Sequence, residues 1–98
     1  MKFEWDPGKA ASNLRKHGVA FEEAITGFDD PFAQIAPDVK HSLGRETRQW
    51  LIGETDSGRI AVVVFTDRSP GPVRRLISAR SASRKERTLY EFYKRVPL

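Results

Sequence analysis

Apolar residues along the chain recur with two periods, one typical of helices and the other typical of strands. A spacing of i, i+3, i+4, i+7 runs from Phe21 to Phe28, whereas short β-branched and aromatic runs between turn residues are typical of strands. The predicted helices are 7–17, 21–28 and 84–95. The predicted strands are 3–5, 32–36, 48–54, 60–66 and 73–80. The predicted loops are 37–47 and 67–72.

Residues at the ends of the predicted helices support these boundaries. The Asp6 carboxylate can accept hydrogen bonds from free N–H groups of the first turn, and Pro7 fits the first helical position. Gly18 favours the left-handed conformation that commonly ends a helix. Ser83 and Glu86 have the spacing of a capping box, which predicts the start of the last helix. The apolar residues that share one face of that helix are Leu89, Phe92, Tyr93 and Val96.

The order of the elements, β-α-α-β-β-β-β-α, predicts an α+β fold with a single domain over residues 1–98. Short connections join the last four strands, apart from residues 37–47, so we expect them to form an antiparallel meander. The segment 60–66 is the most apolar strand and should lie at the centre of the sheet. The two N-terminal helices can cover one face of this sheet, which gives a two-layer domain.

Composition excludes several classes of protein. The longest apolar run, Ile60–Phe65, has six residues, whereas a membrane-spanning helix needs about 20. The first residues are charged and lack the apolar stretch of a signal peptide. The chain contains no cysteine, which excludes disulfides, thiolate metal sites and cysteine nucleophiles. We therefore expect a cytoplasmic protein that does not associate with a membrane.

Positive charge is concentrated in the last quarter of the chain. Residues 74–98 contain eight Lys or Arg and two acidic residues, which gives this segment a net charge of +6. The preceding residues have a net charge of −2, so the whole chain carries +4. Such a segment can face a polyanion or can be a solvated basic surface. The excess of eleven arginines over six lysines favours a nucleic-acid partner, because the guanidinium fork matches phosphate.

Histidine is the first candidate for chemistry, and His17 and His41 are the two in the chain. His17 follows Asn13 by one helical turn and lies at a helix C-terminus, where the dipole favours imidazolium. It could therefore serve as a general acid or a phosphate ligand, or it could simply end the helix. His41 falls in a polar loop, where a solvated side chain is the simpler interpretation. Two histidines without cysteine or an H-x-x-x-H pair do not indicate a zinc site, so we expect neither metal nor cofactor.

Arginines near the ends of strands form the second candidate. Alternation places Arg48 beside Trp50 on one face of their strand, and Arg74 on the same face as Arg80. If Arg48, Arg68 and Arg80 converge near Trp50, the sheet offers phosphate contacts together with base stacking. The alternative is an ordinary sheet whose terminal arginines reach solvent.

A basic site of this kind can cleave RNA without a metal ion. The 2′-OH of the RNA is the nucleophile, so the protein needs only to orient it, stabilise the charged phosphorane and protonate the leaving 5′-oxygen. Other reaction classes lack their motifs, because the sequence contains no G-x-G-x-x-G, P-loop or G-x-S-x-G pattern. The carboxylates are scattered, and no pair is placed for glycoside chemistry.

Two motifs resemble those of the BrnT family of type II toxins. The first is W-D-P…N-x-x-K-H-G-V-x-F-E-E-A from Trp5 to Ala24, followed by Phe28-Asp29-Asp30-Pro31. The second is Ile77-Ser78-Ala79-Arg80-x-Ala82-Ser83-x-x-Glu86. Together they span nearly the whole chain. The sequence departs from the family at Ala20, where a Ser or Thr helix cap is common, and in the loop 69–72.

The resemblance implies a RelE-like fold and ribonuclease activity that blocks translation. With the chemistry of the basic site, this makes a metal-independent endoribonuclease the leading hypothesis. It implies catalytic roles for His17 in the K-H-G motif, for Arg80 in the S-A-R motif, and for Arg68 after the central strand. The residues that we expect to bind RNA are Arg48, Trp50, Arg74 and Arg84.

The resemblance also implies a protein partner, a BrnA-type antitoxin with a ribbon-helix-helix DNA-binding part. Operator DNA would then be bound only through the antitoxin. An acidic segment of the antitoxin is expected to cover basic residues drawn from Arg74, Arg80, Arg84, Arg87 and Arg95. Because the RelE-like group also contains gyrase-targeting toxins, the alternative is a non-catalytic binder of gyrase or a plain RNA-binding module.

Overall fold

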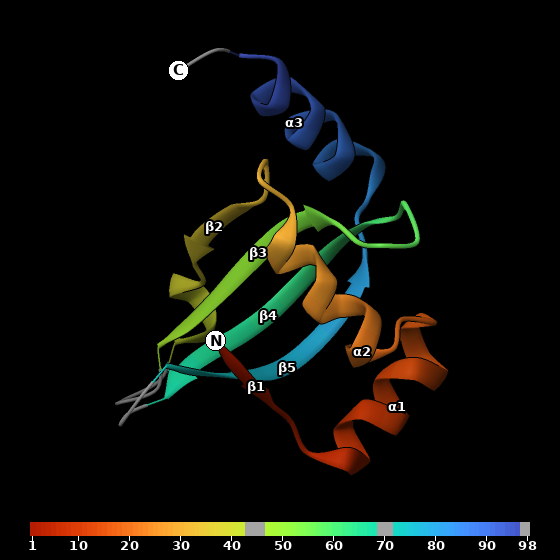
Figure 1. The fold of residues 1–98 in the computed structure, drawn as a ribbon, viewed down its shortest axis with the longest axis vertical. Helices are drawn as coiled ribbons and strands as arrows, with labels where there is room; N and C mark the ends of the chain where they lie inside the picture. Colours follow the sequence, from red (N-terminus) through yellow and green to blue (C-terminus); the bar gives the residue numbers. More distant parts are fainter. Residues whose placement is uncertain (43–46, 69–71, 97–98) are drawn as a thin grey trace.

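A five-stranded sheet with strand order β1-β5-β4-β3-β2 forms the centre of the molecule (Figure 1). The computed structural model describes residues 1–42, 47–68 and 72–96, apart from the side chain of His41. The strands are β1 Lys2–Glu4, β2 Gln34–Pro37, β3 Arg48–Glu54, β4 Ile60–Arg68 and β5 Val73–Ser81. The helices are α1 Pro7–His17, α2 Phe21–Ala24 and α3 Arg84–Arg95, with 3₁₀ turns η1 Ile25–Asp29 and η2 Val39–His41.

The predicted order of elements and the antiparallel meander are confirmed, with β4 at the centre of the sheet. The order of the elements did not predict how β1 pairs. It lies parallel to β5, with residues 2–4 opposite residues 73–75. This pairing joins the first strand of the chain to the last. None of the helices in the described residues is long and apolar enough to cross a membrane.

Local chemistry explains where the helices begin and end. The Asp6 side chain accepts a hydrogen bond from the Lys9 N–H, and Gly18 ends α1 with a φ of 70°, as predicted. Ser83 and Glu86 form the predicted capping box at the start of α3. The predicted helix 21–28 is wrong in its second half, which is the 3₁₀ turn η1. The Thr26 hydroxyl there donates to the Glu23 carbonyl, an alternative to regular helical bonding.

The strand boundaries also differ from the prediction in small ways. Strand β2 starts at Gln34 rather than residue 32, because the Asp30 side chain accepts the Phe32 N–H and forms a tight turn first. Strands β4 and β5 continue to Arg68 and Ser81. The predicted loop 37–47 contains η2. Residues 43–46 of this loop and residues 69–71 of the predicted loop 67–72 lie outside the described residues, and so does the His41 side chain.

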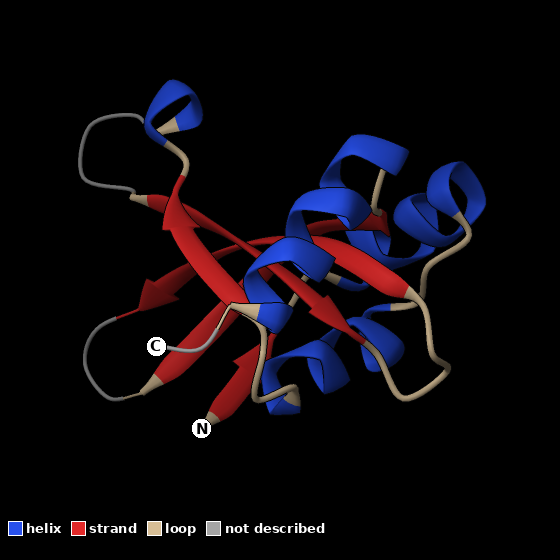
Figure 2. Ribbon diagram, turned by 90° about the horizontal axis from the view of Figure 1, so that it is seen from above, coloured by secondary structure: helices blue, strands red, loops and turns tan. Residues whose placement is uncertain are grey.

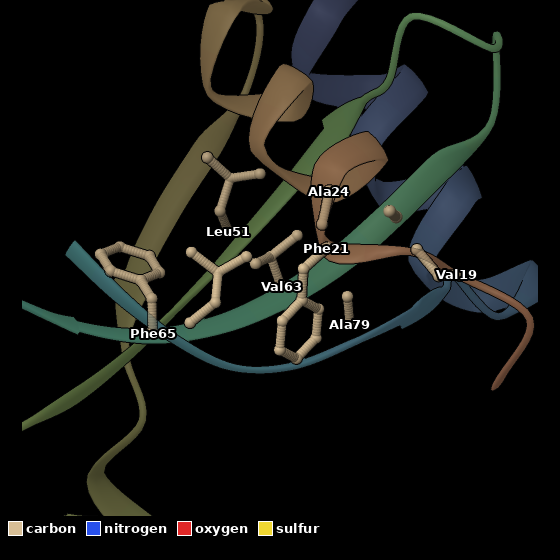
Figure 3. Close-up of a cluster of buried hydrophobic side chains, with 9 residues drawn as sticks. Val19, Phe21, Ala24, Leu51, Val63, Phe65 and Ala79 are labelled. Carbon is tan, nitrogen blue, oxygen red and sulfur yellow. The ribbon is translucent and has the colours of Figure 1, made fainter. Parts of the chain in front are cut away.

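The main hydrophobic core lies between the sheet and the N-terminal helices (Figure 3). Its buried residues are Val19, Phe21, Ala24, Leu51, Ala61, Val63, Phe65, Leu76 and Ala79. Burial of each large member contributes about 1.5–3 kcal/mol. The backbones of η1 and β3 approach so closely that a Cβ on Gly53 would lie 2.8 Å from the Gly27 carbonyl oxygen. The predicted cover of one sheet face by the N-terminal helices is therefore confirmed.

A smaller cluster anchors α3 at one end of the opposite face of the sheet (Figures 1 and 2). Its buried residues are Ile52, Val62, Ala82 and Tyr90. The Tyr90 hydroxyl donates to the Asp30 carboxylate, which also accepts the Glu54 N–H. Burial and the Asp30 carboxylate raise the pKa of Tyr90. For Asp30, burial alone would raise the pKa, but the hydrogen bonds from the Glu54 N–H and the Tyr90 hydroxyl outweigh it, so the pKa is lowered. Tyr90 thus fixes α3 by packing and by a charge-assisted hydrogen bond.

Candidate functional site

The second face of the sheet carries the small cluster under α3 at one end, and most of its other side chains are partly exposed. We call it the open sheet face. The pairing register arranges it in rows that run across the strands, and neighbouring rows lie about 7 Å apart. In order, the rows are Arg68–Val73–Lys2, Arg48–Thr66–Arg75–Glu4, Ala36–Trp50–Val64–Ser78 and Gln34–Ile52–Val62–Arg80. Trp50 therefore lies between a row with two arginines and a row that ends in Arg80.

A β-bulge in β5 decides which arginines reach the open sheet face. Val64 pairs with Ser78, but the next residue, Phe65, pairs with Leu76, so Ile77 is an extra residue. The extra residue reverses the alternation. Arg75, Ser78 and Arg80 consequently share the open sheet face.

The predicted placement of Arg74 on the face of Arg80 is wrong, because the bulge lies between them. The Arg74 guanidinium stacks over the rings of Phe28 and Phe65, 4.9 and 5.1 Å from their centroids, and bonds to Asp67. Phe65 belongs to the main core. Arg74 therefore packs on the side of the sheet that carries α1 and α2.

Arg75 takes the place on the open sheet face that sequence analysis gave to Arg74. Its Nη1 donates to Glu4 Oε2 over 2.7 Å, an ion pair that joins β5 to β1. Sequence analysis placed Arg75 on the other face, and a bulge has no clear sequence signal that would have corrected this. Arg48 is partly buried in the same row as Arg75.

Arg80 is held by a carboxylate from the next element of the chain. Its Nη1 and Nη2 donate to the two Glu86 oxygens over 2.7 and 2.8 Å. Glu86 also accepts the Ser83 N–H over 2.7 Å as part of the capping box. The bond from Arg80, more than any other cause, lowers the pKa of Glu86 to about 2. The Arg80 fork is therefore preset in orientation, and a phosphate that binds through both terminal nitrogens must replace Glu86.

We expect this ion pair to make the fold sensitive to acid. Because the folded-state pKa of Glu86, about 2, lies below its ordinary value, the pair stabilises the fold above pH 4.5 and loses this effect as the pH falls toward 2. Wild-type protein should lose more unfolding free energy in this pH window than Glu86→Gln, which lacks the titrating carboxylate. The difference should be about 1 kcal/mol, because the pair is partly solvated. Urea unfolding at several pH values measures it, with the exposed Glu91→Gln as control. An equal acid response in both variants would contradict the assignment.

Asn13 positions the end of α1 against the edge of β5. Its Nδ2 donates to the carbonyls of Val19 and Ala79 over 2.9 and 2.8 Å, and its Oδ1 accepts the Ala79 N–H over 3.0 Å. The buried side chain thus bonds to β5 as a neighbouring strand would. His17, one turn further on α1, is exposed. Because residues four apart on a helix are neighbours, His17 lies near the end of β5 that carries Arg80.

The three predicted catalytic residues lie on three different elements, α1, β4 and β5. His17 ends α1, and Arg80 follows Ala79, the β5 residue to which Asn13 of α1 bonds. Arg68 shares the open sheet face with Arg80 but lies three rows away, or about 20 Å. One phosphate is therefore too small to contact both Arg68 and Arg80, and a site shared by His17, Arg68 and Arg80 stays a prediction. Arg84, predicted to bind RNA, is the exposed first residue of α3.

Comparison with known proteins places this geometry in a family. Residues 5–86 match the family model described as the ribonuclease toxin, BrnT, of type II toxin–antitoxin systems. The chain belongs to the BrnT family. It is therefore a ribonuclease toxin of a type II toxin–antitoxin system, a class with an RNA target and an antitoxin partner. This confirms the resemblance seen in the sequence motifs.

A solved structure agrees with the BrnT assignment. The 1.1 Å crystal structure of the ribonuclease toxin BrnT of Brucella abortus is similar to this chain, with a TM-score of 0.64 and 29% sequence identity. The match covers 86% of this chain and 99% of the Brucella chain. No curated protein matches the chain. The α+β fold of this BrnT-family member is thus that of a known ribonuclease toxin.

Proposed function

We propose that this BrnT-family toxin is an endoribonuclease that cuts RNA without a metal ion and thereby blocks translation. The observation that carries the proposal is the open sheet face, where Trp50 lies between the row of Arg48 and Arg75 and the row of Arg80. Bases of a single strand can stack on the half-buried indole, while guanidinium groups on both sides bind the flanking phosphates. The same arrangement supports RNA binding for Arg48 and Trp50, and it removes Arg74 from that surface.

The chemistry proposed for this face is internal transesterification. The RNA 2′-oxygen attacks the adjacent phosphorus and loses its proton to solvent, and the bond from phosphorus to the 5′-oxygen breaks. A 2′,3′-cyclic phosphate and a 5′-hydroxyl are formed. Arg80 would stabilise the charge that builds on the phosphorane, and His17 at the same end of β5 would protonate the leaving 5′-oxygen. Arg68, about 20 Å from Arg80, would contact a phosphate further along the strand.

The decisive experiment is incubation of the purified toxin with end-labelled RNA in EDTA. Cleavage that yields 2′,3′-cyclic phosphate ends is the expected result, and an Arg80→Ala protein purified in parallel controls for contaminating nuclease. RNA binding without cleavage would instead support an RNA-binding module. Inhibition of gyrase supercoiling without loss of RNA would support the gyrase-targeting alternative. Requirement for an added divalent ion would overturn the metal-independent mechanism.

RNA affinity is expected to fall steeply with salt. Each phosphate contact on a single strand contributes about −0.7 to the slope of log affinity against log salt, so three or four arginine contacts give about −2 to −3. Arg75→Gln should make the slope less steep by about 0.7, because Arg75 lies on the open sheet face. Arg74→Gln, one residue earlier but on the other face, should leave it unchanged. Fluorescence anisotropy on catalytically inactive protein measures both slopes, and equal slopes would contradict the assigned faces.

For the partner, we propose a BrnA-like antitoxin with a ribbon-helix-helix part, through which alone the toxin would contact operator DNA. The toxin and antitoxin would act in the cytoplasm. The proposal is supported by the match to a type II toxin family and by the exposed cations of α3. Acidic antitoxin side chains would contact some of Arg80, Arg84, Arg87 and Arg95. Opposite charge would also speed the association of toxin and antitoxin.

A further inference from the structure

The outer surface of α3 carries apolar side chains that the described part of the chain leaves about half exposed. They are Leu89, Phe92, Tyr93 and Val96, which are 45%, 59%, 53% and 40% exposed. Their spacing of i, i+3, i+4, i+7 places them in one line along the helix, which we call the α3 stripe. The buried residue of α3 is Tyr90 instead. An amphipathic helix normally turns its apolar stripe toward the core, so the α3 stripe points to a partner.

The α3 stripe continues into a groove shared with the turn before β2. Phe32, Tyr93 and Val96 line this groove together with Lys94 and Arg95. The Lys94 amine lies 5.3 Å from the centroid of the Phe32 ring. A second hollow lies beside the N-terminal half of the stripe, where Leu89 and Phe92 adjoin Arg84 and Lys85. Both hollows therefore combine apolar walls with cations at the rim, an arrangement typical of protein interfaces.

Charge decides which partner fits. Helix α3 contains five cations and two acids, and Glu86, one of the acids, is already bound to Arg80. A second copy of this chain docked stripe to stripe would bring the two sets of cations together, which disfavours that pairing. A helix with an apolar face bordered by acidic side chains complements both features of the surface.

We propose that the α3 stripe is the docking site for an acidic amphipathic helix of the toxin's antitoxin. The proposal rests on the toxin–antitoxin function given above and assigns it a surface. Helix α3 starts four residues after Arg80, so a helix docked along α3 ends close to the open sheet face. Its acidic residues can then compete with phosphate for Arg80, which links docking to inhibition. The apolar contacts supply affinity, and the acids supply specificity for the toxin.

The test compares the affinity of purified antitoxin for three toxin proteins. The double variant Leu89→Ser, Phe92→Ser should bind at least 100-fold more weakly than wild type. Val39→Ser removes an equally apolar side chain, 79% exposed on η2, and should bind within about twofold of wild type. Since the altered side chains are exposed, the thermal midpoint and the RNA cleavage rate of the double variant should match wild type.

Other outcomes would overturn the proposal or separate it from the proposed function. Unchanged antitoxin affinity in the double variant overturns it. If light scattering shows that wild-type toxin is a dimer and that the double variant is a monomer, the stripe binds a second copy of the toxin instead. Wild-type toxin could fail to cut RNA while the double variant, unlike Val39→Ser, binds the antitoxin weakly. That result would support the docking site and contradict the ribonuclease mechanism.

Discussion

Replacement of Asn13 by alanine is expected to lower the free energy of unfolding by about 3–5 kcal/mol. The side chain makes three hydrogen bonds to the buried edge of β5 and to Val19. Its removal leaves the Ala79 N–H and two carbonyls without these partners, and each unsatisfied buried group costs about 1–3 kcal/mol. Chemical denaturation followed by tryptophan fluorescence measures the change.

Two further variants test the cause of this loss. Asn13→Asp keeps the acceptor for the Ala79 N–H but turns a second oxygen toward the two carbonyls, so it should destabilise the fold nearly as much as alanine. Ser12→Ala, at the exposed neighbouring position of α1, should stay within about 0.5 kcal/mol of wild type. An Asn13→Asp protein as stable as wild type would show that the hydrogen bonds are not the source.

The second large effect is expected on catalysis. His17→Ala should slow RNA cleavage by about 10²–10⁴-fold, the usual contribution of a general acid, with little change in RNA affinity. The reason is the position of His17 beside the end of β5 that carries Arg80, where the scissile phosphate would lie. Single-turnover cleavage of labelled RNA measures the rate separately from binding.

A modified substrate distinguishes a general acid from a structural residue. RNA with sulfur in place of the scissile 5′-oxygen has a leaving group that needs no proton, so it should restore most of the rate lost in His17→Ala. Lys16→Ala, at the adjacent exposed position, should cleave both substrates like wild type. Arg68→Ala should weaken RNA binding without a comparable loss of rate, because of its separation from Arg80. Wild-type cleavage by His17→Ala would remove His17 from the mechanism.

Much of the fold could be predicted because its signals are local. Asp6, Gly18, Ser83 and Glu86 each satisfy backbone groups within a few residues, so their spacing alone sets the ends of α1 and the start of α3. The hydrophobic spacing likewise located the central strand. The family could be recognised for a related reason, since the motifs that carry the resemblance contain these same local signals.

The candidate site was harder to predict because its geometry depends on long-range pairing. Alternation assigns Arg74 to the face of Arg80, but the single extra residue Ile77 gives that place to Arg75. The spacing of Asn13 and His17 showed that they are neighbours, yet nothing local indicates that Asn13 bonds to Ala79, 66 residues away. The apolar spacing of α3 was visible, but the chain alone does not say whether core or partner covers it.

The parallel pairing of β1 with β5 has a consequence for how the toxin is made. Residues 2–4 find their partners about 70 residues later, and Val19, Phe21 and Ala24 pack against Leu76 and Ala79 of the same late strand. Contacts so distant in sequence form late and slowly during folding. An unfinished chain on the ribosome therefore has neither a closed core nor the Ser78 and Arg80 positions of the open sheet face. We therefore expect ribonuclease activity to appear only when synthesis is almost finished, so that the toxin's own message is not cut while it is translated.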